Sequence, residues 1–202
     1  MATVASLAQR TSRQFELAEL ARTGNLEATQ ELLGQLSPTI GRVVAGVIGA
    51  SHADFDDVAQ QSLIAFVGAL QHYRGECPPA GYASRIAFRV ALRFRKQRNM
   101  ELARLGRLSR LNPPEETAPS PFEVNGHERR KTLLRDLLGK LPEEQAEALA
   151  LRVALGWSLQ EIADATETPP NTVRSRLRLA KDAMRKRIAN NPLLADELEV
   201  SK

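Results

Sequence analysis

The sequence predicts an all-α protein with two small helical domains, an N-terminal helical bundle and a C-terminal helix-turn-helix domain, joined by a proline-rich linker. Three observations predict this fold class. Apolar residues recur at helical spacing over most of the 202 residues. No segment alternates β-branched and polar residues as a half-buried strand would. Residues 111–121 contain four prolines and no apolar period, which is typical of a linker.

The N-terminal domain is expected over residues 14–99. Residues 1–12 are expected to form a mobile end, and the first helix is predicted from Gln14 to about Gly24, where glycine suits a helix C-terminus. Residues 25–36 and 38–48 are predicted as two helices, because Pro38 suits the first position of a helix.

A cationic helix is predicted in the second half of this domain. Asp54 is expected to cap a helix whose apolar residues share one face, and residues 73–81 are expected to form a Gly/Pro loop. The next helix is predicted from Tyr82 to about Arg98. Its basic side chains fall on one face, which suits a phosphate backbone, at Arg85, Arg89, Arg93 and Lys96. Base stacking and a core position are equally open for Tyr82, whereas Phe88 is expected in the core.

After the linker, expected over residues 100–127, a helix-turn-helix is predicted within residues 128–191. Ser158 followed by Glu161 is a capping box, and Trp157 with Ile162 can form its hydrophobic staple. The short helix should end near Thr166. Thr168 is expected to cap the following helix, with Pro169 at its first position.

This last helix carries an apolar stripe and a basic stripe. The second helix of such a unit lies in the DNA major groove with its N-terminal residues at base edges. The expected base contacts are Asn171, Thr172, Arg174, Ser175 and Arg176, and the expected phosphate contacts are Arg178 and Lys181. A solvated basic face on an ordinary bundle helix is the alternative. The coincidence of capping box, staple, turn and one-sided charge favours DNA binding.

Other classes of protein receive little support. Cys77 is the single cysteine and the three histidines are scattered, so no metal site is predicted. No cofactor is expected, and no catalytic residues are expected, because the sequence contains neither a phosphate-cradling glycine loop nor a nucleophile–base pair. The apolar stretch 40–50 contains Arg42 and is too short to cross a membrane. We therefore expect a cytoplasmic protein without membrane insertion.

The order and spacing of these segments resemble the bacterial extracytoplasmic-function (ECF) group of sigma factors, within the sigma-70 family. The family's acidic motif D-x-E-D-L-V-Q-E is similar to residues 54–61, and its R-G…F-x-x-W-L-x-x-I-A motif is similar to residues 74–87. Its L-P…Q and S-x-x-E-I-A…G-T-V-K-S-R-L motifs are similar to residues 141–145 and 158–177.

The resemblance implies a function and its partners. The N-terminal domain would bind core RNA polymerase and melt and hold the promoter −10 element, and the C-terminal domain would read the −35 element. Contact with the clamp helices of the β′ subunit would fall to Asp54, Asp56, Asp57, Gln60 and Gln61. The −10 contacts would fall to Tyr82, Arg85, Arg89, Arg93 and Lys96. An anti-sigma factor commonly covers both domains in this family, and the sequence leaves open whether one exists here.

A conventional dimeric helix-turn-helix regulator is the alternative function. It would account for the C-terminal segment but would leave residues 54–98 without a role. Binding of promoter DNA by a free dimer, rather than only together with polymerase, would distinguish it from a sigma factor.

Overall fold

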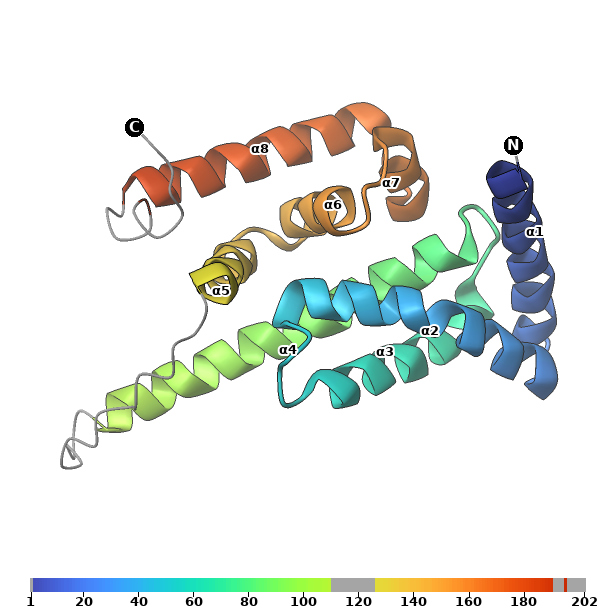
Figure 1. Cartoon of the computed structure of the whole chain (residues 1–202), viewed down its shortest axis with the longest axis horizontal. Helices are drawn as coiled ribbons and strands as arrows, with labels where there is room; N and C mark the ends of the chain where they lie inside the picture. The colour runs from blue at the N-terminus through green and yellow to red at the C-terminus, as the bar shows by residue number, and fades with distance from the viewer. Residues whose placement is uncertain (1, 110–125, 191–194, 196–202) are drawn as a thin grey trace.

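The computed structural model describes residues 2–109, 126–190 and 195, and this part of the chain contains helices and no strand (Figure 1). The predicted all-α fold is therefore confirmed. The helices of the first group are α1 (Ala2–Arg22), α2 (Leu26–Ile48), α3 (Phe55–Ala69), the 3-10 helix η1 (Leu70–His72) and α4 (Pro79–Ser109). Those of the second group are α5 (Gly126–Gly139), α6 (Glu143–Ala154), α7 (Leu159–Thr166) and α8 (Pro170–Ala189).

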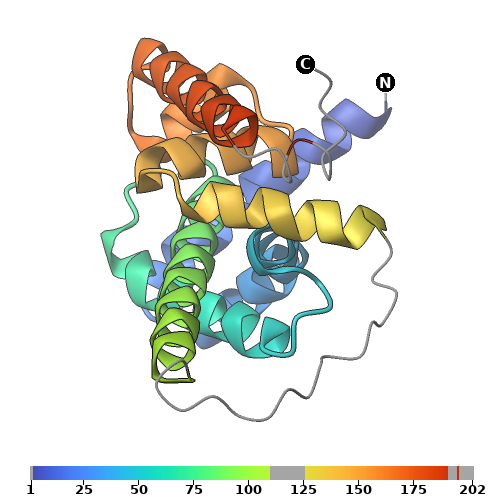
Figure 2. The ribbon, with the colours of Figure 1, turned by 90° about the vertical axis from the view of Figure 1, so that its left-hand side faces the viewer.

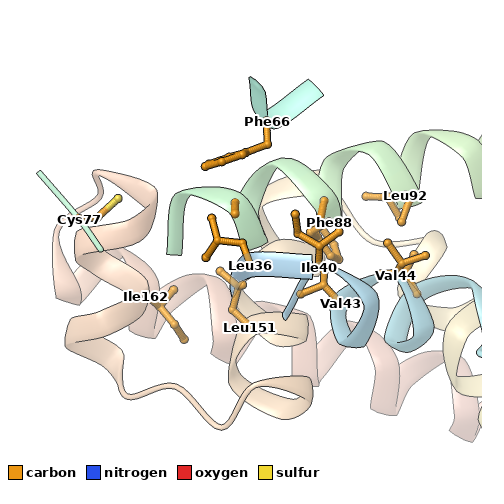
Figure 3. Close-up of a cluster of buried hydrophobic side chains, with 14 of the residues drawn as sticks. Leu36, Ile40, Val43, Val44, Phe66, Cys77, Phe88, Leu92, Leu151 and Ile162 are labelled. Carbon is orange, nitrogen blue, oxygen red and sulfur yellow. The ribbon is translucent and has the colours of Figure 1, made fainter. Parts of the chain in front are cut away.

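The core of the first group forms around α2, which packs against α1, α3 and α4. Phe66 of α3 and Phe88 of α4 are completely buried, so the prediction of a core position for Phe88 is confirmed. Leu36 and Ile40 of α2 approach Phe88, and Leu151 of α6 lies beside them (Figure 3). The core therefore continues from the first group of helices into the second.

The two groups lie against each other through α5, α6 and α7. Helix α6 contacts α2 and α4, and α7 contacts α4. Helix α5 lies between α8 and the α2–α4 pair (Figures 1 and 2). The last turns of α4 extend beyond this contact region (Figure 1).

Two predictions about the N-terminal segments were wrong. Helix α1 already begins at Ala2, where a mobile end was expected. Residues 2–12 contain no glycine or proline and are rich in alanine, which favours helix. Residues 26–48 form one helix with Pro38 inside it. Leu36 and Ile40 on either side of Pro38 are buried. Burying two such side chains stabilises by roughly 3–6 kcal/mol, which offsets the ~3 kcal/mol cost of an internal proline.

Asp54 occupies the predicted N-cap position of α3, whereas both ends of α4 differ from prediction. The side chain of Asp54 makes no capping hydrogen bond, because its carboxylate accepts one from Arg98 at 3.1 Å. Helix α4 begins at Pro79, three residues before the expected start, and continues to Ser109 rather than to Arg98. Residues 100–109 of the expected linker are thus helical, and residues 110–125, with the prolines, lie outside the described residues.

Candidate nucleic-acid interface

The capping box predicted at the start of α7 is confirmed. The backbone N–H of Glu161 donates to Oγ of Ser158 at 3.2 Å, and the Ser158 N–H donates to Oε2 of Glu161 at 2.7 Å. These hydrogen bonds from Ser158 lower the pKa of Glu161. Ile162 is completely buried in the following turn. The capping box of Ser158 and Glu161 therefore fixes where α7 starts, and the buried side chain of Ile162 fixes which face of α7 turns inward.

The predicted cap of α8 was wrong. Pro169 occupies the N-cap position and Pro170 begins the helix. The Thr168 hydroxyl instead donates to the Thr166 carbonyl at 2.9 Å and accepts from Nη1 of Arg176 at 3.1 Å. Thr168 therefore links the turn to α8 through its hydrogen bond with Arg176, without capping the helix.

Helix α8 buries one face and exposes the other. Val173, Leu177 and Ala180 are buried against α6 and α7 and anchor the helix. The opposite face is exposed and carries most of the predicted DNA contacts, which are Asn171, Thr172, Arg174, Ser175, Arg178 and Lys181. An exposed cationic helix face that follows a tight turn can enter a DNA groove.

Side-chain hydrogen bonds organise the N-terminal end of this exposed face. Nη1 of Arg174 donates to Oδ1 of Asn171 at 3.0 Å, and the Ser175 hydroxyl donates to the Asn171 carbonyl at 3.0 Å. The amide and the guanidinium therefore lie side by side. Both groups are of the kind that recognises base edges.

Arg176 is placed differently from the other predicted base contacts. Its side chain is only 22% exposed, and Nη2 lies 3.1 Å from Oε2 of Glu144 on α6. With Thr168 on its other side, the guanidinium holds α6, the turn and α8 together. Its position at the edge of the buried stripe, next to Leu177, was the sequence signal for this role.

The four basic residues predicted to form one face of α4 differ in their exposure and in their partners. Arg93 is exposed and Lys96 is half-buried, whereas Arg85 and Arg89 meet acidic residues of the second helix group. Nε of Arg85 and Nε of Arg89 lie 3.6 Å and 3.5 Å from Oε1 of Glu147. Burial raises the pKa of Glu147 more than the two arginines lower it.

Two aromatic residues, one in the first turn of α4 and one in the loop before it, are packed against their neighbours. The Tyr82 hydroxyl donates to the Ala69 carbonyl at 3.2 Å, and its ring lies 5.1 Å from that of Tyr73. Tyr73 is buried and donates to the Cys77 carbonyl. Stacking of Tyr73 on exposed bases is therefore incompatible with this arrangement, whereas half-buried Tyr82 still lines a pocket of about 440 Å³ together with Arg85.

The acidic helix α3 presents a mixed polar and apolar surface. Asp56, Asp57, Gln60 and Gln61 are exposed, while Asp54 is engaged by Arg98 at 3.1 Å. Two large apolar residues continue the exposed face, namely Ile64 (64% exposed) and Val67 (40% exposed). Sequence reasoning missed both, although neither fits the apolar stripe of Ala59, Leu63, Phe66 and Leu70. Apolar residues left outside a buried stripe are the signal for such a surface.

Among residues 2–109, 126–190 and 195 there is no cluster of three or more histidine, cysteine or acidic residues suited to a metal. None of the described helices is both long enough and apolar enough to span a membrane.

Several known proteins are similar to this chain in sequence. Residues 131–184 match the family model for sigma-70, region 4. The RNA polymerase sigma-H factor of Pseudomonas aeruginosa is 31% identical over 199 residues, covering 90% of this chain and 95% of that protein. The ECF RNA polymerase sigma factor SigD of Mycobacterium tuberculosis is 30% identical over 164 residues, covering 76% of this chain and 74% of that protein.

The chain is an ECF RNA polymerase sigma factor of the sigma-70 family. The ECF sigma factor ShbA of Streptomyces griseus is 28% identical over 169 residues and aligns with 78% of this chain and 86% of its own length. The solved structure of CnrH, in complex with the cytosolic domain of CnrY, shares the fold with a TM-score of 0.53 at 21% identity, covering 89% of this sigma factor and 99% of that chain. None of these similarities supports the alternative of a dimeric regulator.

Proposed function

We propose that this sigma factor directs core RNA polymerase to promoters through three surfaces and is not itself an enzyme. The exposed face of α8 docks in the major groove of the −35 element, with Asn171 and Arg174 at base edges and Arg178 and Lys181 at phosphates. The observation that carries this assignment is the paired, exposed Asn171 and Arg174 at the N-terminal end of a helix anchored by its opposite face.

The second surface is the cationic face of α4 with the loop before it. Arg85, Arg89, Arg93 and Lys96 meet the −10 element there, and Tyr82 contacts a base unstacked from it. Separating the strands costs a few kcal/mol per unstacked base, which contacts of the exposed strand with these side chains offset. Residues 14–99 act as the −10 and polymerase domain and residues 128–191 as the −35 domain, with residues 100–127 between them.

The third surface is the exposed face of α3, which docks on the β′ clamp helices of the polymerase. Asp56, Asp57, Gln60 and Gln61 supply the polar contacts, and Asp54 contributes while held by Arg98. Ile64 and Val67 supply apolar area within the same face. A protein that binds RNA polymerase acts in the cytoplasm. We also propose that an anti-sigma factor binds this protein and covers these surfaces.

Binding to purified core polymerase tests the third surface directly. Asp57→Lys reverses an exposed charge on α3 and should weaken core binding while leaving helicity unchanged. Glu27→Lys, at an exposed acidic residue in the first turn of α2, is the matched control and should bind core as the wild type does. Equal core affinity of the wild type and the Asp57→Lys variant would refute the placement of this surface.

A further inference from the structure

We propose that a pocket between the turn after α2, the second half of α4 and helix α5 binds a free nucleotide. Guanidinium groups on its walls would hold the phosphates, and apolar side chains would cover the base. None of the side chains assigned above to promoter DNA or to polymerase lines this pocket. The inference therefore goes beyond the proposed function.

The pocket lies where three segments that are distant in the sequence meet. Its volume is about 460 Å³, which falls within the range of sites for small organic ligands. Helix α5 lies beside α2 and α4 at this place (Figure 2). A site of this size has room for a ring system as well as a phosphate group.

The charge of the walls favours an anion. Arg95 and Arg98 of α4 and Arg135 of α5 line the pocket, and Asp136 is the single carboxylate among the described lining residues. Three guanidinium groups and one carboxylate leave a net charge of +2. A guanidinium presents its N–H donors in a planar fork that matches the oxygens of a phosphate.

Arg95 is held rigidly at one wall of the pocket. Its side chain is 12% exposed, and its Nη1 donates to the Val47 carbonyl at 2.6 Å while its Nη2 donates to Oδ1 of Asp136 at 2.7 Å. The buried Nε has no hydrogen-bond partner within the described part of the chain. A largely buried charge of this kind is stabilised when a second anion comes close.

The other two arginines approach from different elements. Nη1 of Arg98 lies 3.1 Å from Oδ2 of Asp54, but the Arg98 side chain is 50% exposed, and an exposed ion pair contributes little stability. On the opposite wall, Nη1 of Arg135 would lie 3.3 Å from a Cβ at Gly49. Gly49 has a φ of 102°, which favours glycine. The turn after α2 therefore also leaves space for this guanidinium.

Apolar side chains give the pocket a second kind of surface. Phe94 is half-buried, with its ring centroid 5.8 Å from that of His52. Leu102 is 57% exposed at the same pocket. A bare phosphate ion would gain nothing from these groups, whereas planar rings pack on aromatic and guanidinium faces. The combination of arginines with apolar area points to a nucleotide rather than to inorganic phosphate.

The position of the pocket on α4 favours a free nucleotide over one in a DNA strand. Successive residues of an α-helix are about 100° apart around the axis, so Arg95 lies about 200° from the exposed Arg93. DNA bound to the Arg93 side of α4 would therefore face away from the pocket. A small molecule can reach the pocket independently of promoter binding.

Binding of N-methylanthraniloyl-ADP to the full-length protein, followed by fluorescence anisotropy, tests the proposal. Arg98→Ala removes a half-exposed guanidinium from the pocket, and Leu102→Glu adds a carboxylate at an exposed position. Arg104→Ala is the matched control, because this exposed arginine lies on the same helix about 180° around the axis from Arg95. Circular dichroism confirms that each variant is folded.

The wild type should bind the labelled ADP, and each of the two pocket variants should bind it about 10- to 100-fold more weakly. The Arg104→Ala variant should bind as the wild type does. Unlabelled ADP should displace the probe. Adenosine and inorganic phosphate at the same concentration should displace much less of it, because each offers only one of the two parts that the pocket contacts.

Three results would overturn the proposal. The first is no binding of the labelled ADP to the folded wild type at millimolar concentration. The second is an equal loss of affinity in Arg98→Ala and Arg104→Ala, which would show general attraction to a basic protein. The third is displacement by a mixed-sequence single-stranded DNA as strong as that by ADP and dependent on Arg98, which would assign the pocket to a nucleic-acid strand.

Discussion

Replacing Arg174 with alanine should reduce recognition of the −35 element without affecting the fold. The guanidinium is exposed on α8, and its described hydrogen bond goes to the neighbouring Asn171 at 3.0 Å. Removing an exposed side chain of this kind changes the free energy of unfolding by no more than about 0.5 kcal/mol. A good base contact from arginine contributes roughly 1–3 kcal/mol of discrimination. Affinity for the preferred duplex should therefore fall by about 5- to 150-fold.

The assay measures binding of reconstituted holoenzyme to duplexes that vary at each position of the upstream element. Arg174→Ala should lose preference at one or two base pairs while binding core polymerase normally. Arg185→Ala, an exposed arginine further along α8 with a partner at Asp182 on the same helix, is the matched control and should weaken binding slightly and uniformly. A uniform loss for Arg174→Ala, with a salt slope smaller by about 1, would identify a phosphate contact and refute the assignment to a base.

Three further predictions follow from the structure. Ile64→Asp should weaken core binding by roughly tenfold or more, because it places a charge in the apolar contact that α3 would bury against polymerase. Leu26→Asp, at an apolar residue 83% exposed on α2, is the control and should leave core binding unchanged in the same titration. Ser158→Ala should lower the free energy of unfolding by about 0.5–2 kcal/mol, measured by urea denaturation; an unchanged midpoint would show that the capping box contributes nothing. Because the folded-state pKa of Glu147 is raised, its contribution to stability is fully present below the unfolded pKa of about 4.3 and is lost as pH rises through the folded value. The unfolding free energy of the wild type should therefore fall relative to Glu147→Gln over that window, and a constant difference would contradict the burial of this carboxylate.

Local sequence signals predicted the C-terminal unit well. The spacing of Ser158 and Glu161 defines a capping box whose two hydrogen bonds form within four residues, so the start of α7 needs no information from the rest of the fold. The buried stripe of α8 follows in the same way from the spacing of Val173 and Leu177. Where one short segment supplies both partners of an interaction, sequence is sufficient.

Predictions failed where distant segments decide the outcome. Pro38 was assigned to a helix start, but burial of Leu36 and Ile40 against other helices keeps α2 continuous. Arg85 has the spacing of a DNA contact, yet its partners lie on α6 and α7. A periodic basic face shows that the side chains share one side of a helix. It does not show whether solvent, DNA or the chain's own carboxylates lie opposite.

Promoter-directed transcription is the sharpest test of whether this sigma factor selects promoters through α8. Purified core polymerase would transcribe fragmented genomic DNA from the source organism with and without this protein, and the 5′ ends of the transcripts would be sequenced. We expect a small set of new start sites that share upstream elements and disappear with the Arg174→Ala variant. If a protein shown to be folded gives only the start sites of core polymerase alone, it does not direct polymerase to promoters.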